Sequence, residues 1–153
     1  MPNDSSITYS IVHNDQELSG AGFTRDDVAD FLFTHLDEFG DPRNHILNAI
    51  GYAMGDGPGQ DGFILIAHEE GAVLGAVVMN NTNMKGYIPE YILVYIAVHG
   101  EARGRGLGKG LMQHIVEHTD GSIALHVEPD NPARHLYDKI GFTNKYLEMR
   151  YQK

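Results

Sequence analysis

Apolar residues along the chain fall into six short extended runs separated by polar and helical segments. The runs predict strands at residues 7–13, 63–70, 72–80, 91–98, 122–128 and 143–152. The run YILVYIAV at 91–98 has no polar alternation, which favours a strand covered on both faces near the middle of a sheet. The second and third runs are separated only by Glu70-Gly71, so we expect a tight hairpin between them.

Helical periodicity and capping signals predict helices at 24–40, 41–55, from the glycine-rich stretch to about 118, and 131–141. Thr24, followed by Asp27 three positions later, forms a capping-box pattern. Asp41 and Asn131 each precede a proline, the arrangement of an N-cap followed by proline in the first helical turn. The order of elements predicts a single α/β domain over residues 1–153 with a mixed sheet.

Composition and charge narrow the classes of protein. The chain has 153 residues, 42% of them apolar, and no cysteine, which excludes disulfides and a thiolate nucleophile. A formal net charge of −10 argues against a nucleic-acid or anionic-membrane surface. The first ten residues lack the apolar core of a secretion signal, and the longest apolar run is far shorter than a membrane span. We therefore expect a soluble cytoplasmic protein.

One stretch, EARGRGLGKGL at 101–111, reverses this acidic character. It places three cations and four glycines between the apolar run at 91–98 and a predicted helix. Backbone N–H groups at a helix N-terminus, freed from Cβ crowding by glycine, form an anion-binding nest. The stretch fits neither the Walker pattern, because Arg103 and Gly110 stand at required positions, nor G-x-G-x-x-G, because Lys109 replaces the third glycine. We therefore expect the stretch to bind a diphosphate, but through neither of those two nucleotide-binding motifs.

Two motifs together resemble the GNAT superfamily of acetyl-CoA-dependent N-acetyltransferases. IAVHGEARGRGLGKGLM carries the [R/Q]-x-x-G-x-[G/A] signature at Arg103, Gly106 and Gly108, and EPDNPARHLYDKIGF carries an N-x-x-A-x-x-L-Y-x-x-x-G-F signature. The resemblance implies a mixed, mostly antiparallel central sheet flanked by helices. It also implies that the sheet splays between the two strands that bracket the cofactor-loop helix, with acetyl-CoA as co-substrate and no metal.

The resemblance also assigns residues to the cofactor. The pyrophosphate of coenzyme A is expected on the glycine-rich loop, and the pantetheine arm on the main chain of the strand before it, with Asn131 bonding that arm or a neighbouring carbonyl. The cofactor-binding candidates are Ile96, Ala97, Val98, Arg103, Gly104, Arg105, Gly106, Leu107, Gly108, Lys109 and Asn131. The Val98 amide is the candidate donor to the oxyanion.

For catalysis the resemblance places Tyr137 near the thioester sulfur, where a phenol can protonate the leaving thiolate. From the residue alone, a buried aromatic side chain is the alternative. The strand glutamate that many relatives use as base is Ile92 here, so Glu90 is our first candidate base. His99, Glu128 or water are the other candidates, whereas His126 is interpreted as a partly buried structural histidine.

The predicted function is direct transfer of an acetyl group from acetyl-CoA to a primary amine of a small molecule or peptide. A non-catalytic acyl-CoA-binding or sensing module is one alternative. A zinc hydrolase is another, because HIVEH at 114–118 matches H-x-x-E-H. Relatives in the family that the motifs resemble commonly end in a β-hairpin whose loop helps to cover the acceptor site, whereas only one strand is predicted after Phe142 here. The resemblance therefore implies an acceptor pocket that is open or completed by a partner in a homodimer.

Overall fold

The computed structural model describes residues 6–153, so the first five residues, part of the predicted signal-free N-terminus, lie outside the described residues. The strands are β1 (Thr8–Val12), β2 (Gly62–Glu69), β3 (Ala72–Asn81), β4 (Tyr91–Val98) and β5 (Ile123–Leu125). The helices are α1 (Asp15–Gly20), α2 (Arg25–Leu36), α3 (Arg43–Ala53), α4 (Leu107–His118) and α5 (Arg134–Ile140), with 3₁₀ turns η1 (Asp37–Phe39) and η2 (Gly100–Ala102).

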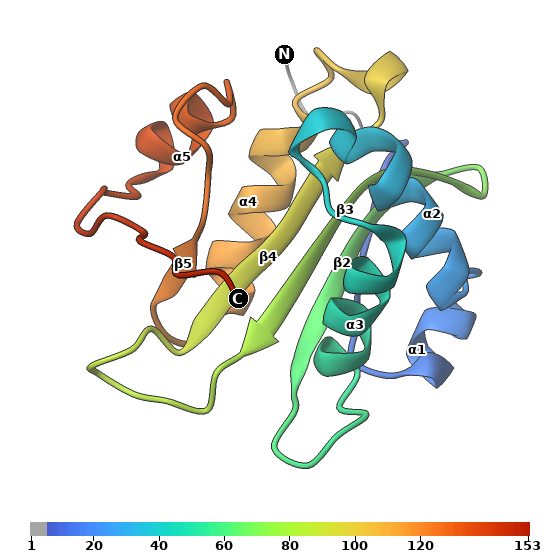
Figure 1. Cartoon of the computed structure of the whole chain (residues 1–153). Coiled ribbons are helices and arrows are strands. Elements are labelled where there is room, and N and C mark those ends of the chain that lie inside the picture. The colour runs from blue at the N-terminus through green and yellow to red at the C-terminus, as the bar shows by residue number, and fades with distance from the viewer. Residues whose placement is uncertain (1–5) are drawn as a thin grey trace.

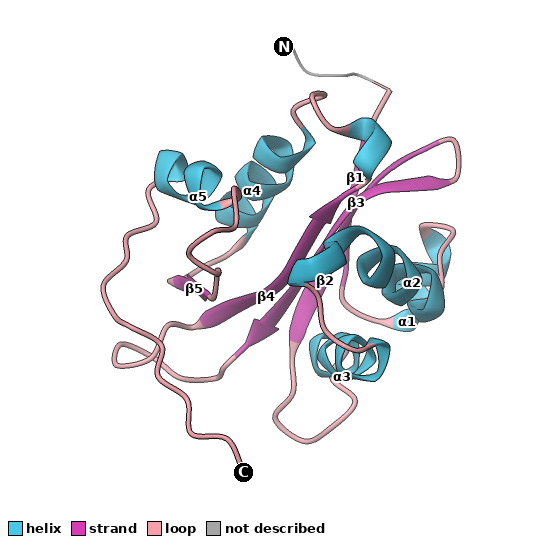
Figure 2. Ribbon diagram, turned by 45° about the horizontal axis from the view of Figure 1, so that its top comes forward, coloured by secondary structure: helices cyan, strands magenta, loops and turns pink. Residues whose placement is uncertain are grey.

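The five strands form one mixed sheet in the order β1-β2-β3-β4-β5 (Figures 1 and 2). The pairs β1–β2, β2–β3 and β3–β4 are antiparallel, and β5 is parallel to β4. One apolar cluster packs α1, α2 and α3 on one face of the sheet, and a second packs α4 and α5 on the other. The predicted α/β class, with a mostly antiparallel sheet between helices, is confirmed.

The sheet splays at β4 and β5. These strands pair only from Tyr91 with Ile123 to Leu93 with Leu125, so the second half of β4 has no pairing with β5. The predicted strand at 122–128 is correspondingly cut to three residues. Figure 1 shows β5 diverging from β4, with α4 behind the sheet between them in the chain. The splay that the family resemblance implies is therefore present.

A bulge in β4 marks the point of divergence. Val78 pairs with Tyr95 and Met79 with Leu93, so Val94 is an extra residue on β4. Tyr91, Leu93, Ile96 and Val98 consequently share the α4 face although their spacing is not a strict period of two. This bulge explains why the sequence of β4 shows no clear alternation.

The structure also differs from the sequence prediction near the N-terminus, at the start of α3 and at the C-terminus. The sequence analysis did not predict α1, whose six residues follow Asn14, an N-cap that accepts a hydrogen bond from the Glu17 amide at 2.8 Å. The helix predicted from Asp41 begins at Arg43, because the Asp41 carboxylate bonds elsewhere. The strand predicted at 143–152 was wrong, since these residues form no strand and all are exposed.

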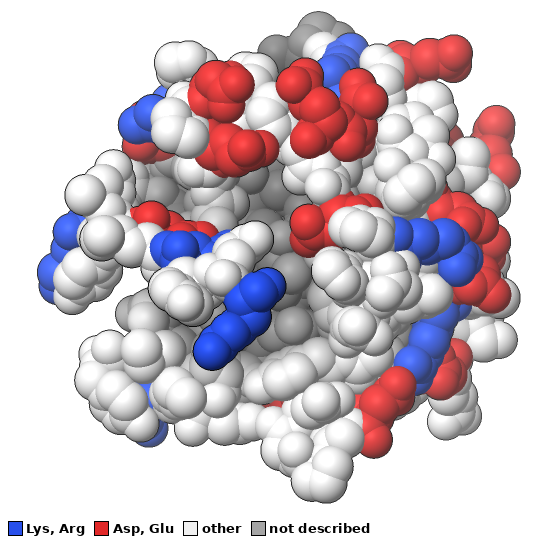
Figure 3. Space-filling model, viewed as in Figure 1, with Lys and Arg blue, Asp and Glu red and all other residues white. Residues whose placement is uncertain are grey.

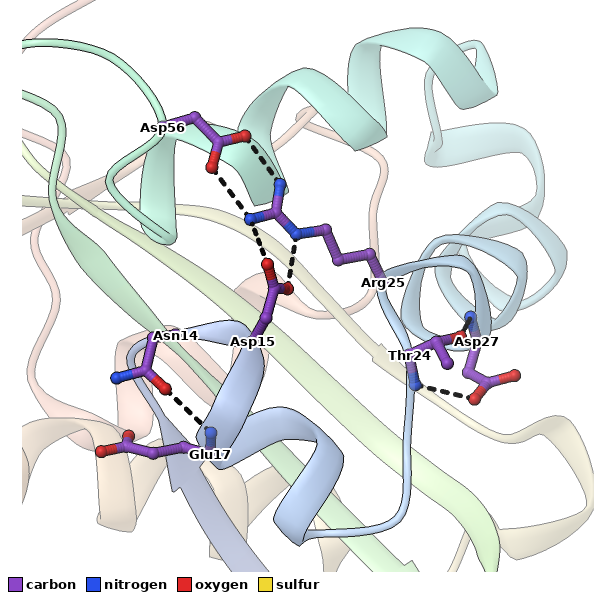
Figure 4. Close-up of polar contacts among 7 residues, drawn as sticks. All are labelled: Asn14, Asp15, Glu17, Thr24, Arg25, Asp27 and Asp56. Atoms are coloured by element: carbon purple, nitrogen blue, oxygen red, sulfur yellow. Dashed lines mark hydrogen bonds and ion pairs between the residues drawn. The ribbon is translucent and has the colours of Figure 1, made fainter.

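Arg25 ties the N-terminal helices together (Figure 4). Its guanidinium donates to Asp15 of α1 at 2.7 and 3.0 Å and to Asp56 beyond α3 at 2.7 and 2.9 Å. The predicted capping box of Thr24 and Asp27 is present at the start of the same helix. These bonds fix the layer that covers one side of the splayed sheet.

Among residues 6–153, no helix combines the length and the apolar character needed to span a bilayer.

Candidate active site

The glycine-rich loop forms an open hollow at the N-terminus of α4. Gly104 and Gly106 adopt left-handed backbone conformations with φ of 91° and 76°, and Gly106 is the N-cap of α4 without a side-chain cap. A Cβ at either position would meet nothing within 4 Å. The hollow has a volume of about 550 Å³ and is lined by Val98, Arg103, Gly104, Gly106, Leu107, Gly108 and Lys109. Uncapped helix amides facing open space fit the diphosphate of coenzyme A.

The other two glycines of the stretch serve packing within the protein. A Cβ at Gly108 would lie 3.2 Å from Leu136 of α5, and one at Gly110 would lie 2.3 Å from the Tyr9 hydroxyl of β1. Gly108 therefore permits the approach of α5 to α4, while Gly110 makes room for Tyr9 on the sheet. Sequence alone could not separate these two roles from ligand approach.

The three cations of the loop are used differently. Arg105 donates to Glu69 of β2 at 2.9 Å, so its charge is balanced within the protein. Arg103 and Lys109 line the hollow and are exposed. The structure therefore leaves Arg103 and Lys109 as the better-placed side chains for a phosphate, while Arg105 holds the loop against β2.

The residues predicted to pair with pantetheine lie on the free edge of β4. Ile96, Ala97 and Val98 follow the last pairing of β4 with β5, and on the other side they pair with Val77, Ala76 and Gly75 of β3. Val98 also lines the hollow of the glycine loop. An extended chain entering from the loop can therefore continue along this edge.

Asn131 and Tyr137 lie in and just before α5. Asn131 is not the N-cap of that helix, since its side-chain oxygen accepts from the Ala133 amide at 2.9 Å in the preceding turn. Tyr137 is 7% exposed and belongs to the same apolar cluster as Leu93, the last β4 residue paired with β5. Burial raises the pKa of Tyr137 to about 12, and no residue among 6–153 hydrogen-bonds its hydroxyl. Tyr137 thus keeps its proton at neutral pH.

Comparison with known proteins identifies the family. The acetyltransferase (GNAT) domain family matches residues 60–144, more than half of the chain. The chain belongs to the GNAT acetyltransferases. Members of this family use acetyl-CoA as acetyl donor, and the glycine-loop hollow, the free edge of β4 and Tyr137 all fall within or beside the matched segment. A search of curated proteins found no match.

Solved structures share this GNAT fold. An integron cassette protein from the mobile metagenome of V. cholerae is 21% identical, with a TM-score of 0.65 over 97% of this chain and 93% of that one. The ribosomal-protein-alanine N-acetyltransferase of Brucella melitensis biovar Abortus 2308 is 17% identical, with a TM-score of 0.64 over 96% and 99%. An aminoglycoside N-acetyltransferase in complex with CoA is 17% identical, with a TM-score of 0.63 over 100% and 98%.

Glu90, the first of the predicted bases of this GNAT acetyltransferase, lies away from the cofactor loop. It precedes β4, whose other end enters the loop, and its carboxylate accepts from the Ser122 amide at 2.9 Å. That hydrogen bond lowers the pKa of Glu90. A carboxylate held in this way is a weak base, so its most direct role is to fasten β4 to the turn before β5.

His99 and Glu128 occupy other places. His99 caps η2 by accepting from the Glu101 amide at 3.1 Å, and its ring lies 4.2 Å from that of His35 on α2. Burial, His99 and Arg103 together lower the pKa of His35. Glu128 is exposed in the turn after β5, where its carbonyl accepts from the Asn131 amide. His99 therefore joins α2 to the start of the cofactor loop.

His126 is exposed, contrary to its interpretation as a partly buried structural histidine. Ile123, Leu125 and Val127 pack in the cluster on the α4 face, and the exposed His126 between the last two is not part of that cluster. His126 directly follows Leu125, the last paired residue of β5. His126 therefore lies where β4 and β5 separate, and no hydrogen bond among residues 6–153 engages its imidazole. Only the register of β5 could have shown this.

A second group includes Tyr95, which the sequence analysis did not single out. The nearly buried Tyr95 of β4 donates to the Asp41 carboxylate at 2.6 Å. Burial and this hydrogen bond raise the pKa of Tyr95. Asp41 lies in the α2–α3 connection, where Asp37 and Glu38 are also exposed. Figure 3 shows acidic side chains gathered along the upper part of this face, above a hollow in its middle. This part of the surface is therefore acidic.

The histidines of the H-x-x-E-H match pack against aromatic rings. His114 contacts the Gly110 carbonyl through Nδ1 at 2.8 Å and stacks on Tyr9 at 4.2 Å between ring centroids. His118 lies edge-on to Phe63 at 4.7 Å. Among residues 6–153, no three potential ligands group as a metal site would require. Both histidines are thus explained by the contacts of α4 with the sheet.

Proposed function

We propose that this acetyltransferase moves an acetyl group from acetyl-CoA to a primary amine of a small molecule or peptide. The observation that carries the proposal is the continuous path from the uncapped start of α4, along the free edge of β4, to the splay. Bound there, acetyl-CoA would supply an activated thioester. Similar folds include an aminoglycoside N-acetyltransferase and a ribosomal-protein-alanine N-acetyltransferase, both named for amine acceptors.

The proposed binding contacts divide along this path. Backbone amides between Gly104 and Lys109 hold the diphosphate, with Arg103 and Lys109 adding charge-assisted hydrogen bonds. The main chain of Ile96 and Ala97 pairs with the pantetheine arm. The Val98 amide donates to the carbonyl oxygen as negative charge develops there. Asn131 holds the turn that places α5 beside the arm.

The proposed proton movements use two residues near the splay. His126, exposed directly after β5, accepts the proton that the attacking amine must lose, directly or through one water. The new C–N bond forms as the C–S bond breaks. Tyr137, in the cluster on the α4 face, donates its proton toward the departing sulfur. With no cysteine in the chain, the acetyl group goes directly to the amine without an enzyme thioester.

The role of Glu90 as the base stays a prediction, and a Glu90 variant is the comparison for a His126 variant. Because the Glu90 carboxylate accepts from the Ser122 amide, we expect Glu90→Gln to lower the free energy of unfolding with little effect on turnover. We expect His126→Asn to lower turnover with little effect on the free energy of unfolding. Equal losses of turnover in both variants would assign the base role jointly. Loss confined to Glu90→Gln would return it to Glu90.

The test is release of CoA thiol from acetyl-CoA across a panel of polyamines, amino acids, aminoglycosides and peptides. A thiol-specific dye reports only the product, because the protein itself has no cysteine. We expect turnover with one amine class. If acetyl-CoA binds stoichiometrically but every amine fails, the non-catalytic acyl-CoA-binding module replaces the enzyme proposal.

A further inference from the structure

Two histidines hold three consecutive backbone amides of the η2 turn. The Gly100 amide donates to Nδ1 of His35, which comes from α2, at 3.4 Å. The Glu101 amide donates to Nδ1 of His99 at 3.1 Å, and the Ala102 amide donates to the His99 carbonyl oxygen at 2.9 Å. Every amide of the turn is therefore bonded to one of these two residues.

The η2 turn sets where the cofactor loop begins. The backbone amide of His99 donates to the Leu74 carbonyl of β3 at 2.8 Å, and Ala102 is buried in the cluster that contains α4, so both ends of the turn are anchored. Arg103 follows the turn directly and lines the hollow of the glycine loop. The two imidazoles thus connect α2 to the position of Arg103.

These contacts need both imidazoles in the neutral form. A ring nitrogen that accepts from an amide carries no proton, so Nδ1 is unprotonated and Nε2 carries the hydrogen in His35 and in His99. A proton added at Nδ1 would set one N–H against another and break the bond to the turn. The ring centroids lie only 4.2 Å apart, so two charged rings would also repel each other.

The surrounding charges do not offset that cost. Besides each other, the half-buried rings have Arg103 of the loop nearby, whose charge acts on His35. Asp27 and Asp30 line a hollow with His35, but they accept from the N-cap amide of α2 and from an arginine of α3. The residues of the β2–β3 hairpin that line this hollow are uncharged. Neither imidazole forms an ion pair with a carboxylate among residues 6–153.

We propose that the neutral His35–His99 pair positions the cofactor loop for acetyl-CoA, and that protonation of this pair weakens acetyl-CoA binding. The proposal rests on the proposed binding of acetyl-CoA at the start of α4. Burial, His99 and Arg103 lower the pKa of His35 below its ordinary value of 6.5, so the pair stays neutral at pH 7. The contact to the turn is therefore complete above pH 6.5 and is lost as the pH falls through the lower value of the folded protein.

The direction of this effect separates positioning from direct contact. An imidazolium that touched a phosphate of the ligand would strengthen binding in acid. Here both Nδ1 atoms are bonded to amides of the turn instead, so a proton disturbs the loop before it can attract the ligand. Acid should therefore weaken binding.

Calorimetric titration of coenzyme A at pH 8 and pH 5.5 tests this prediction. We expect wild-type binding to weaken by about fivefold more between these pH values than binding to His35→Asn/His99→Asn. An asparagine carbonyl oxygen can accept from the same amide but takes up no proton, and protonation of the ligand phosphate is common to all proteins compared. The control His45→Asn, at an exposed position on α3, should keep the wild-type acid dependence.

Equal pH dependence in the wild-type protein and the double variant, or tighter wild-type binding in acid, would overturn the proposal. A second pair of variants separates the hydrogen bond from the proton. His35→Leu removes the acceptor that His35→Asn keeps, so at pH 8 we expect His35→Asn to bind coenzyme A more tightly than His35→Leu. Equal affinity of these two variants would show that the bond to Gly100 does not position the loop.

Nitrogen NMR of the wild-type protein without ligand gives a readout that is independent of acetyl-CoA. We expect Nδ1 of His35 and His99 to be unprotonated at pH 8, and the Gly100 and Glu101 amide resonances to shift as the rings titrate. A proton on either Nδ1 at pH 8, or amide resonances that ignore the titration, would overturn the proposal. If the wild-type protein binds no coenzyme A at pH 8, the proposed function fails, and this NMR result alone then decides whether the pair holds the turn.

Discussion

The proposed role of Tyr137 as proton donor depends on the motif and the structure around this residue. The motif around it predicts a position near the thioester sulfur, and the structure adds that Tyr137 is nearly buried with a raised pKa and has no hydrogen-bond partner for its hydroxyl among residues 6–153. The proposed role of His126 could not be found in the same way, because it depends on where the chain goes directly after β5. Asp41 was predicted as a helix cap and instead accepts from Tyr95.

For Tyr137→Phe we expect kcat to fall by about 10²-fold, because the sulfur loses its proton donor, with acetyl-CoA affinity unchanged. Steady-state kinetics and calorimetric titration measure the two quantities. Tyr91→Phe is the matched control, since it removes a hydroxyl from a tyrosine in the same cluster. Unchanged kcat in the Tyr137 variant would remove this residue from the mechanism.

The pKa of Tyr137 also predicts a pH dependence of stability. Its value is about 12 in the folded protein against 10.0 ordinarily, so the folded state holds the proton more tightly. This contribution is complete below pH 10 and is lost as the pH rises toward 12. We expect the alkaline loss of unfolding free energy to be smaller in Tyr137→Phe by on the order of 2 kcal/mol, measured by denaturant titration. Identical pH profiles in both proteins would contradict the burial of the phenol.

At the scale of elements, periodicity and caps predicted most of the sheet and the four longer helices. The run at 91–98 was predicted correctly as β4, although the bulge at Val94 interrupts the alternation on which strand patterns depend. The strand predicted at 122–128 is shortened to β5 at the point where it separates from β4. The strand pattern at 143–152 is present, but a strand needs a partner, and these residues pair with no strand of the described chain. Glycine density predicted a ligand loop without showing that Gly108 and Gly110 serve packing.

The start of α4 gives a test at this scale. Gly106→Ala should cost about 1–2 kcal/mol, because φ of 76° disfavours a Cβ, and should also weaken acetyl-CoA binding by placing that Cβ in the open hollow. Thermal unfolding with and without acetyl-CoA measures both effects. Gly100→Ala, in the neighbouring η2 turn, meets nothing within 4 Å and should change neither. Equal effects of the two substitutions would argue against a ligand at the start of α4.

At the scale of the whole molecule, three histidines connect separate layers. His35 of α2 accepts a hydrogen bond from the Gly100 amide just before the cofactor loop. The ring of His68 in β2 contacts that of Phe23, and the ring of His118 in α4 contacts that of Phe63. Burial is the largest cause of the lowered pKa of all three. The unfolded chain therefore takes up protons at a higher pH than the folded chain, which makes the whole structure acid-sensitive.

We expect the melting temperature to fall as the pH drops below about 6.5, the ordinary histidine pKa, through the lower values of the folded protein. His118→Gln should reduce this slope, while His45→Gln, at an exposed position on α3, should leave it unchanged. Calorimetry between pH 8 and pH 5 provides the comparison. A melting temperature independent of pH across this interval would rule out the histidine contribution.

Calorimetric titration of acetyl-CoA into the wild-type protein and an Arg103→Ala/Lys109→Ala variant tests the central claim most directly. Both substituted side chains are exposed, so the variant should fold normally. The account predicts one acetyl-CoA per chain, with at least tenfold weaker binding in the variant and a steeper salt dependence in the wild-type protein. Absence of binding to the wild-type protein, or equal affinity in both proteins, would contradict a diphosphate site at the start of α4.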